Sequence, residues 1–276
     1  MASVFVAYAD IRFAESLKRI KRQAKRTHRF DKIFVYTSKD LPDYIKYSPL
    51  FAYSRGGGYW AWKPYVVMDA LSKCEEGDIV CYADSGCSLI KDSEEWNLLF
   101  DKMRDYNALF FQYRDDIVYK EWSGLCKKPE YNSTKIKHWM KPTTKRYFED
   151  YFGNDLFCEY SKIWAGSFFI KKTFPVINII SEWYNLVLFH PILFIDPIGK
   201  EKTELPDGYN VHSHDQSVLT PLVYYYKEKD NVLVLPETSE TDKEHAAIVA
   251  SRYRQKKMNL WLYIKYRLYI LLKGNE

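Results

Sequence analysis

Residues 55–88 read RGGGYWAWKPYVVMDALSKCEEGDIVCYADSGCS. Three glycines lead into a cluster of aromatic and cationic side chains, then a short helical pattern, then an apolar run at 78–83 typical of a buried strand. That run ends on Asp84-Ser85-Gly86. A glycine turn, cations beside aromatic rings and a carboxylate at the carboxyl end of a strand together predict an anionic-ligand site on an α/β sheet.

The segments before this stretch predict a parallel βαβ unit. Residues 3–8 are apolar enough for a buried strand, residues 12–27 have the pattern of a basic helix with one apolar face, and residues 31–37 predict a second strand. A strand–helix–strand spacing this tight favours parallel pairing. A helix at 64–73 would then lead back to the strand at 78–83.

The alternation of helices and strands continues after residue 88. We expect further helices at 94–106, 147–152, 175–189 and 215–227, and further strands at 108–113, 163–171 and 231–235. Residues 114–145 and 190–213 lack a regular period and predict long loops, which often carry function. Without an internal repeat, we expect a single α/β domain over residues 1–250, with a mostly parallel central sheet flanked by helices.

Residues 251–276 predict a separate C-terminal basic amphipathic helix. Its apolar stripe and its cations are Leu260, Trp261, Ile264, Leu268, Leu271 and Leu272, and Arg252, Arg254, Lys256, Lys257, Lys265, Arg267 and Lys273. Such a helix can lie in the interface of an anionic membrane. The alternative is a terminal helix that packs on its own domain.

Composition restricts the class of protein. The chain has 276 residues, 47% hydrophobic, with a net charge of +5, which indicates a globular chain that is mildly basic. Tyr and Trp are abundant, as in platforms for carbohydrate or nucleobase rings, although core packing explains many of them. The five cysteines form no CxxC pair and predict buried free thiols in a reducing compartment. No signal peptide and no apolar run of 18 residues is evident, so we expect a cytoplasmic protein.

The glycine stretch matches neither a Walker A loop nor a G-x-G-x-x-G fingerprint, so by itself it predicts only a mobile turn. Its neighbours are more informative. Arg55 and Lys63 can neutralise a diphosphate, and Tyr59 or Trp60 can close over a ring.

Two acidic positions are candidates for chemistry. Asp84, at the end of an apolar strand, offers a hard oxygen ligand for Mg²⁺ or Mn²⁺ bridging two phosphates; the alternative is a helix cap. His214 and Asp215 open a helix after a long loop and could complete a metal shell or supply a catalytic carboxylate. An ordinary N-cap is again the alternative.

Taken in order, the segments YWAWKP (59–64), YADSGC (82–87), WAGSFFIKKT (164–173) and HSHDQS (212–217) resemble a group of bacterial GT-A-type glycosyltransferases. These enzymes build capsule, lipopolysaccharide or O-antigen glycans. The resemblance covers residues 3–235 and leaves the basic tail outside. It implies a GT-A, Rossmann-like fold.

The resemblance also implies roles for particular residues. The first strand would contact the nucleotide base, so the implied donor-binding residues are Ala7, Tyr8, Asp10, Arg55, Tyr59, Trp60, Lys63, Asp84, Ser85 and Gly86. The implied sugar or acceptor pocket comprises Trp164, Ala165, Gly166 and Gln216. His214 and Asp215 would lie near the reacting sugar, with Asp84 and His214 as ligands of Mn²⁺ or Mg²⁺. The strand-end motif is usually DxD but here has Gly86 in place of the second carboxylate, which puts strict metal dependence in doubt.

We therefore expect an enzyme that moves a sugar from a nucleotide-diphosphate sugar to a growing surface glycan. The expected partners are that donor, a glycan or lipid-linked glycan acceptor and, through the tail, the cytoplasmic face of an anionic inner membrane. Nucleic acid is not expected, because the basic residues outside the tail are dispersed. Two alternatives stay open, a nucleotidyl- or phosphotransferase on a related sheet and a non-catalytic glycan- or membrane-binding protein.

Overall fold

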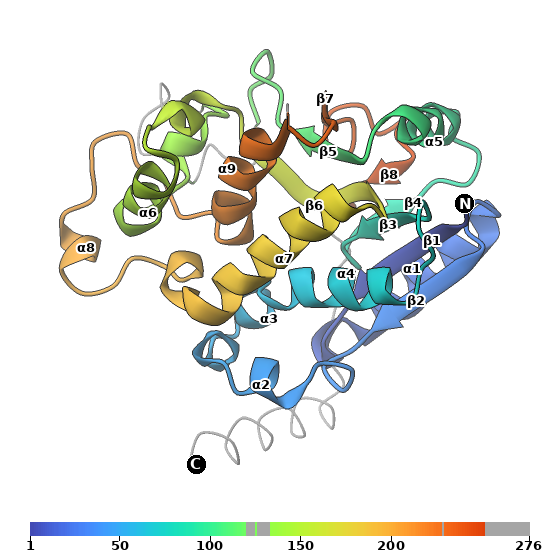
Figure 1. Cartoon of the computed structure of the whole chain (residues 1–276), viewed down its shortest axis with the longest axis horizontal. Coiled ribbons are helices and arrows are strands. Elements are labelled where there is room, and N and C mark those ends of the chain that lie inside the picture. The colour runs from blue at the N-terminus through green and yellow to red at the C-terminus, as the bar shows by residue number, and fades with distance from the viewer. Residues whose placement is uncertain (120–124, 126–132, 228, 252–276) are drawn as a thin grey trace.

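The computed structural model describes residues 1–119, 125, 133–227 and 229–251. They form an α/β fold around a six-stranded sheet with the order β2-β1-β3-β6-β5-β7 (Figure 1). The strands are β1 Ser3–Tyr8, β2 Lys32–Tyr36, β3 Ile79–Ala83, β5 Ala108–Gln112, β6 Ile163–Lys171 and β7 Val232–Pro236.

Five of the six strands point the same way. β1 pairs in parallel with β2 and β3, and β5 pairs in parallel with β7, whereas β6 runs antiparallel between β3 and β5. Every residue of β3, and all of β6 except Lys171, is buried, as expected for central strands covered on both faces. The predicted mostly parallel sheet is confirmed.

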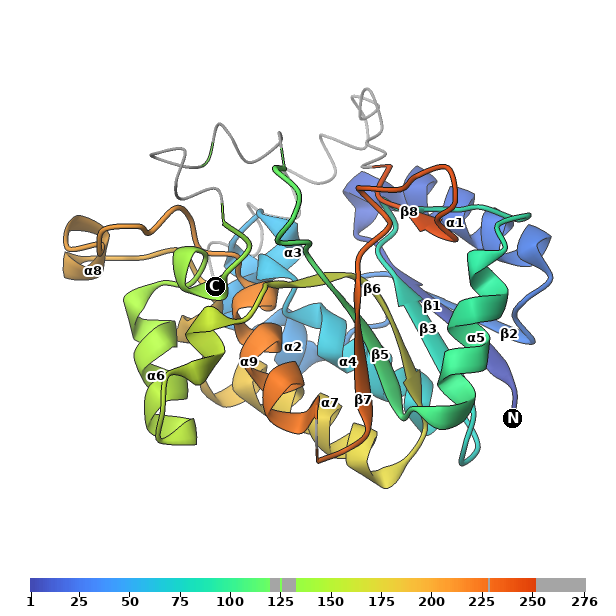
Figure 2. The same ribbon diagram turned by 90° about the horizontal axis from the view of Figure 1, so that it is seen from above.

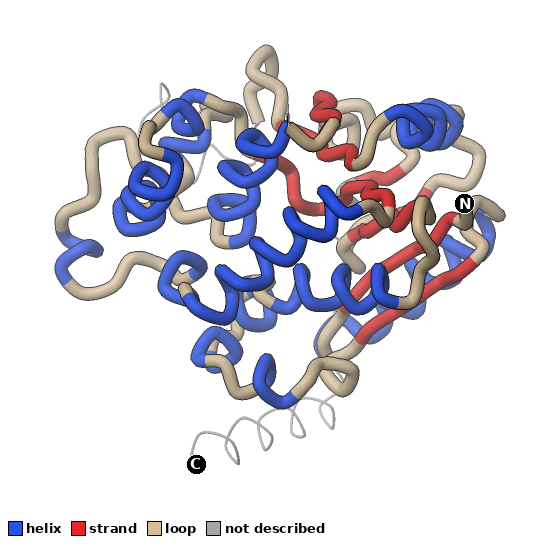
Figure 3. Tube along the Cα trace, in the orientation of Figure 1, coloured by secondary structure: helices blue, strands red, loops and turns tan. Residues whose placement is uncertain are grey.

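Helices cover both faces of the sheet. Figure 2 shows α1 (Ala14–Thr27) and α5 (Glu95–Asp105) on one side. The opposite side carries α4 (Trp62–Ser72), α7 (Phe174–Phe189) and α9 (Asp215–Lys227), which also pack on one another. In Figure 3 the strands therefore lie between two helical layers. All five helices begin within three residues of their predicted start.

The remaining elements are shorter, or their bounds were predicted less accurately from the sequence. α6 spans Pro142–Phe152, so the helix predicted at 147–152 begins earlier, with a proline in its first turn. Elements too short for a periodic pattern were not predicted. They are α2 Asp43–Lys46, α3 Gly56–Tyr59, α8 Lys200–Thr203, the antiparallel pair β4 Ser88–Leu89 and β8 Ile248–Val249, and the 3₁₀ turns Ile11–Phe13, Pro49–Ala52, Ile136–His138, Leu156–Glu159 and Pro191–Phe194.

The prediction of buried free cysteine thiols is confirmed for the four cysteines that the structure describes. Cys74, Cys81, Cys87 and Cys158 are buried and free. Cys126 and the predicted amphipathic helix at 252–276 lie outside the described residues. Within residues 1–119, 125, 133–227 and 229–251, none of the helices combines the length and the apolar character needed to cross a bilayer.

Candidate active site

The carboxyl ends of β1 and β3 lie side by side where the strand order reverses. The chain goes from β1 to β2 on one side, then returns past β1 to β3 on the other. Ligands of open α/β sheets bind in the crevice at such a switch point. Here Asp10 follows β1, Asp84 follows β3, and a cavity of about 640 Å³ opens beside them. We call this the first cavity.

Most of the predicted donor-binding residues line the first cavity. They are Tyr8, Asp10, Arg55, Trp60, Asp84, Ser85 and Gly86. Three predicted residues do not line it. Lys63 lines a second cavity instead, which is described below. Ala7 is fully buried within β1, and buried Tyr59 packs on the His214 ring while donating a hydrogen bond to Asp196 Oδ2 at 3.1 Å. These two residues therefore support the wall of the site rather than form it.

Arg12 also lines the first cavity, and the sequence did not single it out. Its Nε and Nη2 donate to Asp10 Oδ2 at 2.8 and 2.5 Å, and its Nη1 donates to the Ser54 carbonyl at 2.8 Å. The guanidinium thus ties the end of β1 to the segment before the glycines. Its position two residues after the strand-end Asp10 was the available signal.

The glycine stretch forms a left-handed turn. All five residues from Gly56 to Trp60 have positive φ angles, between +54° and +96°. Glycine adopts this region without strain, which explains the run of three. A Cβ on Gly56 would lie 2.4 Å from the Trp60 indole, so the ring rests directly on the glycine backbone.

Backbone N–H groups of this turn are used internally. Tyr59 N donates to the Arg55 carbonyl at 2.8 Å, and Trp60 N donates to the Gly56 carbonyl at 3.2 Å. The turn therefore serves to place the Trp60 ring, which borders both the first cavity and a second one described below. It does not offer these amides as a phosphate cradle.

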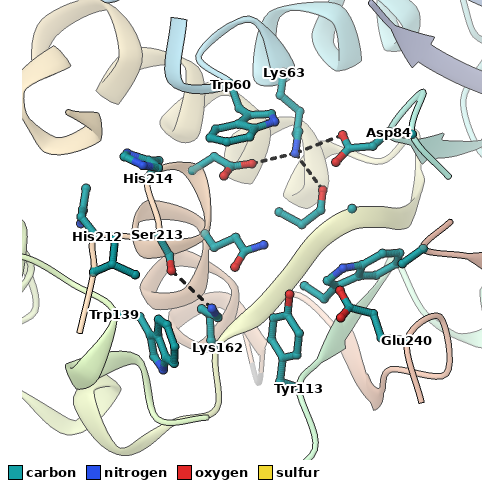
Figure 4. A pocket seen from close by; sticks show the side chains of 18 of the residues that line it. Trp60, Lys63, Asp84, Tyr113, Trp139, Lys162, His212, Ser213, His214 and Glu240 are labelled. Atoms are coloured by element: carbon teal, nitrogen blue, oxygen red, sulfur yellow. Dashed lines mark hydrogen bonds and ion pairs between the residues drawn. The ribbon is translucent and has the colours of Figure 1, made fainter. Parts of the chain in front are cut away.

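A buried ammonium group lies between two predicted site carboxylates. Lys63, from the first turn of α4, is 1% exposed. Its Nζ lies 2.7 Å from Asp215 Oδ2, 2.8 Å from the Ala165 carbonyl and 3.4 Å from Asp84 Oδ1 (Figure 4). The three N–H donors of Nζ are thereby directed at protein oxygens.

The charges of this cluster are tightly coupled. Burial lowers the pKa of Lys63, but Asp215 and Asp84 outweigh burial and the pKa is raised above its usual value. Burial also raises the pKa of Asp215, and the Lys63 ammonium opposes that rise. Lys63 is therefore charged at neutral pH, and it holds two carboxylates from distant parts of the sequence in one place.

Asp84 is the more accessible carboxylate, with 31% of its side chain exposed. Its backbone N–H donates to the Gly166 carbonyl at 2.8 Å, and its Oδ1 accepts the Tyr82 hydroxyl at 2.5 Å. Asp84 borders both cavities, so a ligand in either can reach it. Tyr82 and Lys63 therefore both hold Oδ1 of this carboxylate.

His214 lies in the wall opposite Asp84. Its Nδ1 is 2.8 Å from the Phe194 carbonyl, which only accepts, so Nδ1 carries the proton and Nε2 has the lone pair. Nε2 is buried and has no hydrogen-bond partner among the described residues. Burial lowers the pKa of His214 to about 4, so the ring is neutral at pH 7. His212, by contrast, bonds through both ring nitrogens to the backbone and is structural.

The depressed pKa of His214 predicts an acid-sensitive fold. Between pH 6.5 and 4 the unfolded chain binds a proton at this ring and the folded chain does not, so the free energy of unfolding falls as the pH falls. We expect His214→Asn to remove about 3 kcal/mol of that fall. Asparagine tolerates the φ of +50° at this position. Urea unfolding at pH 7 and pH 4 measures the fall in the free energy of unfolding for the wild type and for His214→Asn. An equal fall in both proteins would contradict the prediction.

A preassembled metal site is not formed by the predicted ligands. The described part of the chain holds no group of three or more His, Cys, Asp or Glu side chains able to hold an ion. In Figure 4, Asp84 lies beside Lys63, whereas His214 lies on the other side of the pocket. Asp84 alone fits as a single protein ligand for an ion that arrives with a diphosphate, and the pairing of Asp84 with His214 does not fit.

The second cavity, of about 340 Å³, adjoins the first and shares Arg55, Trp60, Asp84 and Gly86 with it. Lys63, His214 and Asp215 line it, as do all four residues predicted for the sugar or acceptor pocket: Trp164, Ala165, Gly166 and Gln216. The predicted site residues from four separate segments are therefore brought together around two joined spaces.

An aromatic cage at the far side of the second cavity was missed from the sequence. The Lys162 ammonium lies 4.1 Å from the Trp139 ring centroid and 4.8 Å from that of Tyr113, and it donates to Ser213 Oγ at 3.3 Å. Glu240 also lines this part. Flat rings with polar groups at their edges suit a sugar. Tyr113 directly follows β5 at the ligand edge, which was the signal available for it.

Gly166 has a packing role in this cavity, because a Cβ there would lie 2.5 Å from the Trp164 ring. We expect Gly166→Ala to displace the ring and lower the free energy of unfolding by about 1–3 kcal/mol. In a Trp164→Ala background the same substitution should cost much less, since its obstacle is gone. Urea unfolding of the four proteins tests this, and an equal cost in both backgrounds would refute the packing role.

Comparison with known proteins gives distant structural similarity only. No protein-family model matches the chain, and no curated protein matches it by sequence. A glycosyltransferase involved in glycosylation of the major capsid of PBCV-1 covers 96% of this chain and 100% of its own, at 9% identity and a TM-score of 0.44. The galactosyltransferase LgtC, in complex with donor and acceptor sugar analogues, covers 84% and 72% at 12% identity and 0.38.

A third similar structure is core-mannan synthase A from Aspergillus fumigatus in its Mn/GDP form. It covers 85% of this chain and 72% of its own, at 10% identity and a TM-score of 0.43. All three TM-scores lie below 0.5, so the functional argument rests on the site itself.

Proposed function

We propose that this protein is a glycosyltransferase that moves a sugar from a nucleoside-diphosphate sugar to a hydroxyl group of a glycan. One observation carries the proposal. Two cavities at the topological switch point share a wall that includes Asp84, and the buried Lys63–Asp215 pair lies in the second. A two-substrate transferase needs donor and acceptor in adjoining spaces, with the reacting atoms at their junction.

The first cavity suits the donor. Tyr8 and Asp10, at the end of β1, would contact the nucleoside, and the guanidinium groups of Arg12 and Arg55, which line the same cavity, would face the diphosphate. The sugar would then point past Trp60 and Asp84 into the second cavity. There the cage of Tyr113 and Trp139, together with Trp164 of the same cavity, would hold the acceptor.

In the proposed reaction the bond between the anomeric carbon and the diphosphate oxygen breaks, and a bond to the acceptor oxygen forms. Asp215 would take the proton of the acceptor hydroxyl; its alternative role is to face the anomeric carbon as a carboxylate. Lys63 is a positioning residue, because its donors are directed at Asp215, Asp84 and the Ala165 carbonyl. Arg12 and Arg55 would offset the negative charge that grows on the leaving diphosphate.

The proposal includes a Mn²⁺ or Mg²⁺ ion that would bind together with the donor. When bound, the ion would neutralise charge on the diphosphate, with Asp84 as its protein ligand and phosphate oxygens completing most of the shell. The sequence resemblance supports a bacterial surface glycan (capsule, lipopolysaccharide or O-antigen) as the acceptor.

Ligand-dependent stability tests the donor site. We expect one nucleoside diphosphate, or its sugar conjugate, to raise the melting temperature by several degrees, because a ligand at 100 times its Kd adds about 2.7 kcal/mol of stability. The panel should contain uridine, guanosine, cytidine, adenosine and thymidine diphosphates, each with and without Mn²⁺. The shift should shrink in Asp84→Asn. A protein that responds to none of them would favour a non-catalytic glycan- or membrane-binding role.

A further inference from the structure

The positive charge of this protein is concentrated in two short segments. Residues 14–29 contain seven Lys or Arg and one acidic residue, and residues 252–276 have the same counts, so each segment carries +6. The chain as a whole has 41 basic and 36 acidic residues. The remainder, residues 1–13 and 30–251, therefore has 27 basic and 34 acidic residues and a charge of −7. A uniformly basic surface for solubility does not account for this distribution.

The first of these segments is helix α1, and its two sides differ sharply. Its buried side is Ser16, Leu17, Ile20, Ala24 and Thr27, which pack against β1 and β2. Its outer side, here called the α1 face, consists of Lys18, Lys21, Arg22, Lys25 and Arg26. From Lys18 to Arg26 the face extends over about 12 Å of helix.

The α1 face is poorly neutralised by its own protein. Lys18 pairs with Glu15, whereas the structure gives Lys21, Arg22, Lys25 and Arg26 no acidic partner among the described residues. Three pairs on the face are like charges four residues apart: Lys18 with Arg22, Lys21 with Lys25, and Arg22 with Arg26. Such pairs destabilise a helix. An external anionic surface would relieve this repulsion.

Helix α1 is also linked to Ser251, the last described residue, and to the site. Arg19 points inward and donates to the Ser85 and Cys87 carbonyls at 3.0 and 2.7 Å and to Ser88 Oγ at 2.5 Å. Ser251 Oγ lies 2.8 Å from Ser88 Oγ and donates to the Gly86 carbonyl at 2.8 Å. The described chain therefore ends beside α1, and the sequence of the second +6 segment begins at the next residue.

We propose that the α1 face is a docking surface for an anionic lipid bilayer. The complementarity is electrostatic, and clustered Lys and Arg side chains are attracted to anionic headgroups within a Debye length of the membrane. A bilayer fits better than nucleic acid, because the sequence that follows Ser251 contains Trp261 together with several leucines and isoleucines, side chains suited to an acyl-chain interface. This surface lies outside both cavities and does not depend on the proposed reaction.

Vesicle sedimentation with the full chain tests the surface. The test variant is Lys21→Glu/Arg22→Glu/Lys25→Glu/Arg26→Glu, and the matched control is Lys39→Glu/Lys102→Glu/Lys202→Glu/Lys243→Glu, which makes the same charge change at dispersed exposed positions. On vesicles of phosphatidylglycerol and phosphatidylcholine at 0.1 M salt, we expect the α1 variant to partition at least tenfold more weakly than the wild type. The control should stay within about threefold.

Each other outcome counts against the proposal. Equal partition of the α1 variant and the wild type would show that the face does not meet the membrane, and equal loss in both variants would show a net-charge effect. Partition onto pure phosphatidylcholine that matches the mixed vesicles would exclude an electrostatic surface. Binding of heparin or duplex DNA as tight as binding of the mixed vesicles would indicate a soluble polyanion instead. Circular dichroism melts confirm that both variants fold.

Discussion

Asp215→Asn is expected to lower turnover about 10³-fold while leaving the affinity for the nucleoside diphosphate within about threefold. The carboxylate is the proposed base, and a positioned base typically contributes 10²–10⁴ in rate. Asparagine keeps the shape of the side chain and an oxygen for Lys63 Nζ, which lies 2.7 Å away in the wild type. Single-turnover kinetics and isothermal titration with the nucleotide separate the two quantities.

The control for this experiment is Asp101→Asn, an exposed aspartate on α5 outside both cavities. It should retain full turnover. Loss of nucleotide affinity in Asp215→Asn equal to its loss of rate would contradict the assignment, because Asp215 would then be a binding group for the donor. Full turnover in Asp215→Asn would remove it from the mechanism altogether.

Lys63→Met is expected to lower the free energy of unfolding by about 3–5 kcal/mol and to abolish turnover. Removing the ammonium leaves buried Asp215 without its closest counter-charge, and breaking a buried ion pair from one side costs about this much. Adding Asp215→Asn in the same chain should restore part of the stability but none of the activity. Urea unfolding of the four members of this cycle measures the coupling.

Lys73→Met, at the opposite end of α4, is the matched control. Lys73 pairs with Asp69 at 2.5 Å but is about half exposed, so its loss should cost less than about 1 kcal/mol. The direction in which the stabilising contribution of Lys63 changes with pH also follows from its pKa. Because the pKa of Lys63 is raised in the fold, its contribution is complete below its ordinary value of 10.5 and is lost as the pH rises through the folded value. A Lys63→Met protein as stable as the Lys73→Met protein would contradict the account of the cluster.

Hydrophobic periodicity was sufficient to predict the main strands and helices of this molecule, but it did not predict the short elements. The strand at 79–83 is a continuous apolar run and the strand at 163–171 is mostly apolar, and both were placed from the sequence to within one residue. The antiparallel direction of β6 was not foreseen, because strand direction depends on the path of the connecting chain. The pairing of β4 with β8 joins residues about 160 positions apart and involves only two residues from each strand, too few for a pattern.

Site residues at the ends of strands and helices could be predicted from the sequence. Contacts that depend on the packing of distant segments could not. Asp84 and Asp215 were singled out from their positions at element ends, and the structure does bring both to Lys63. The stacking of Lys162 on Trp139 could not be predicted, because it depends on how the segment before α6 folds over β6. The three glycines predicted a turn, but its left-handed run extends through Tyr59 and Trp60, two residues that seldom adopt positive φ.

The most direct test of the central claim is the product released from a nucleotide sugar. Purified full-length protein should be incubated with a panel of nucleotide sugars, with and without Mn²⁺, and the soluble products separated by anion-exchange chromatography. The proposed reaction predicts that one donor yields the nucleoside diphosphate, and that Asp215→Asn does not produce it. Release of a sugar 1-phosphate, with the nucleoside monophosphate passed to an acceptor, would instead identify a nucleotidyltransferase, and release of neither product from any donor would contradict sugar transfer.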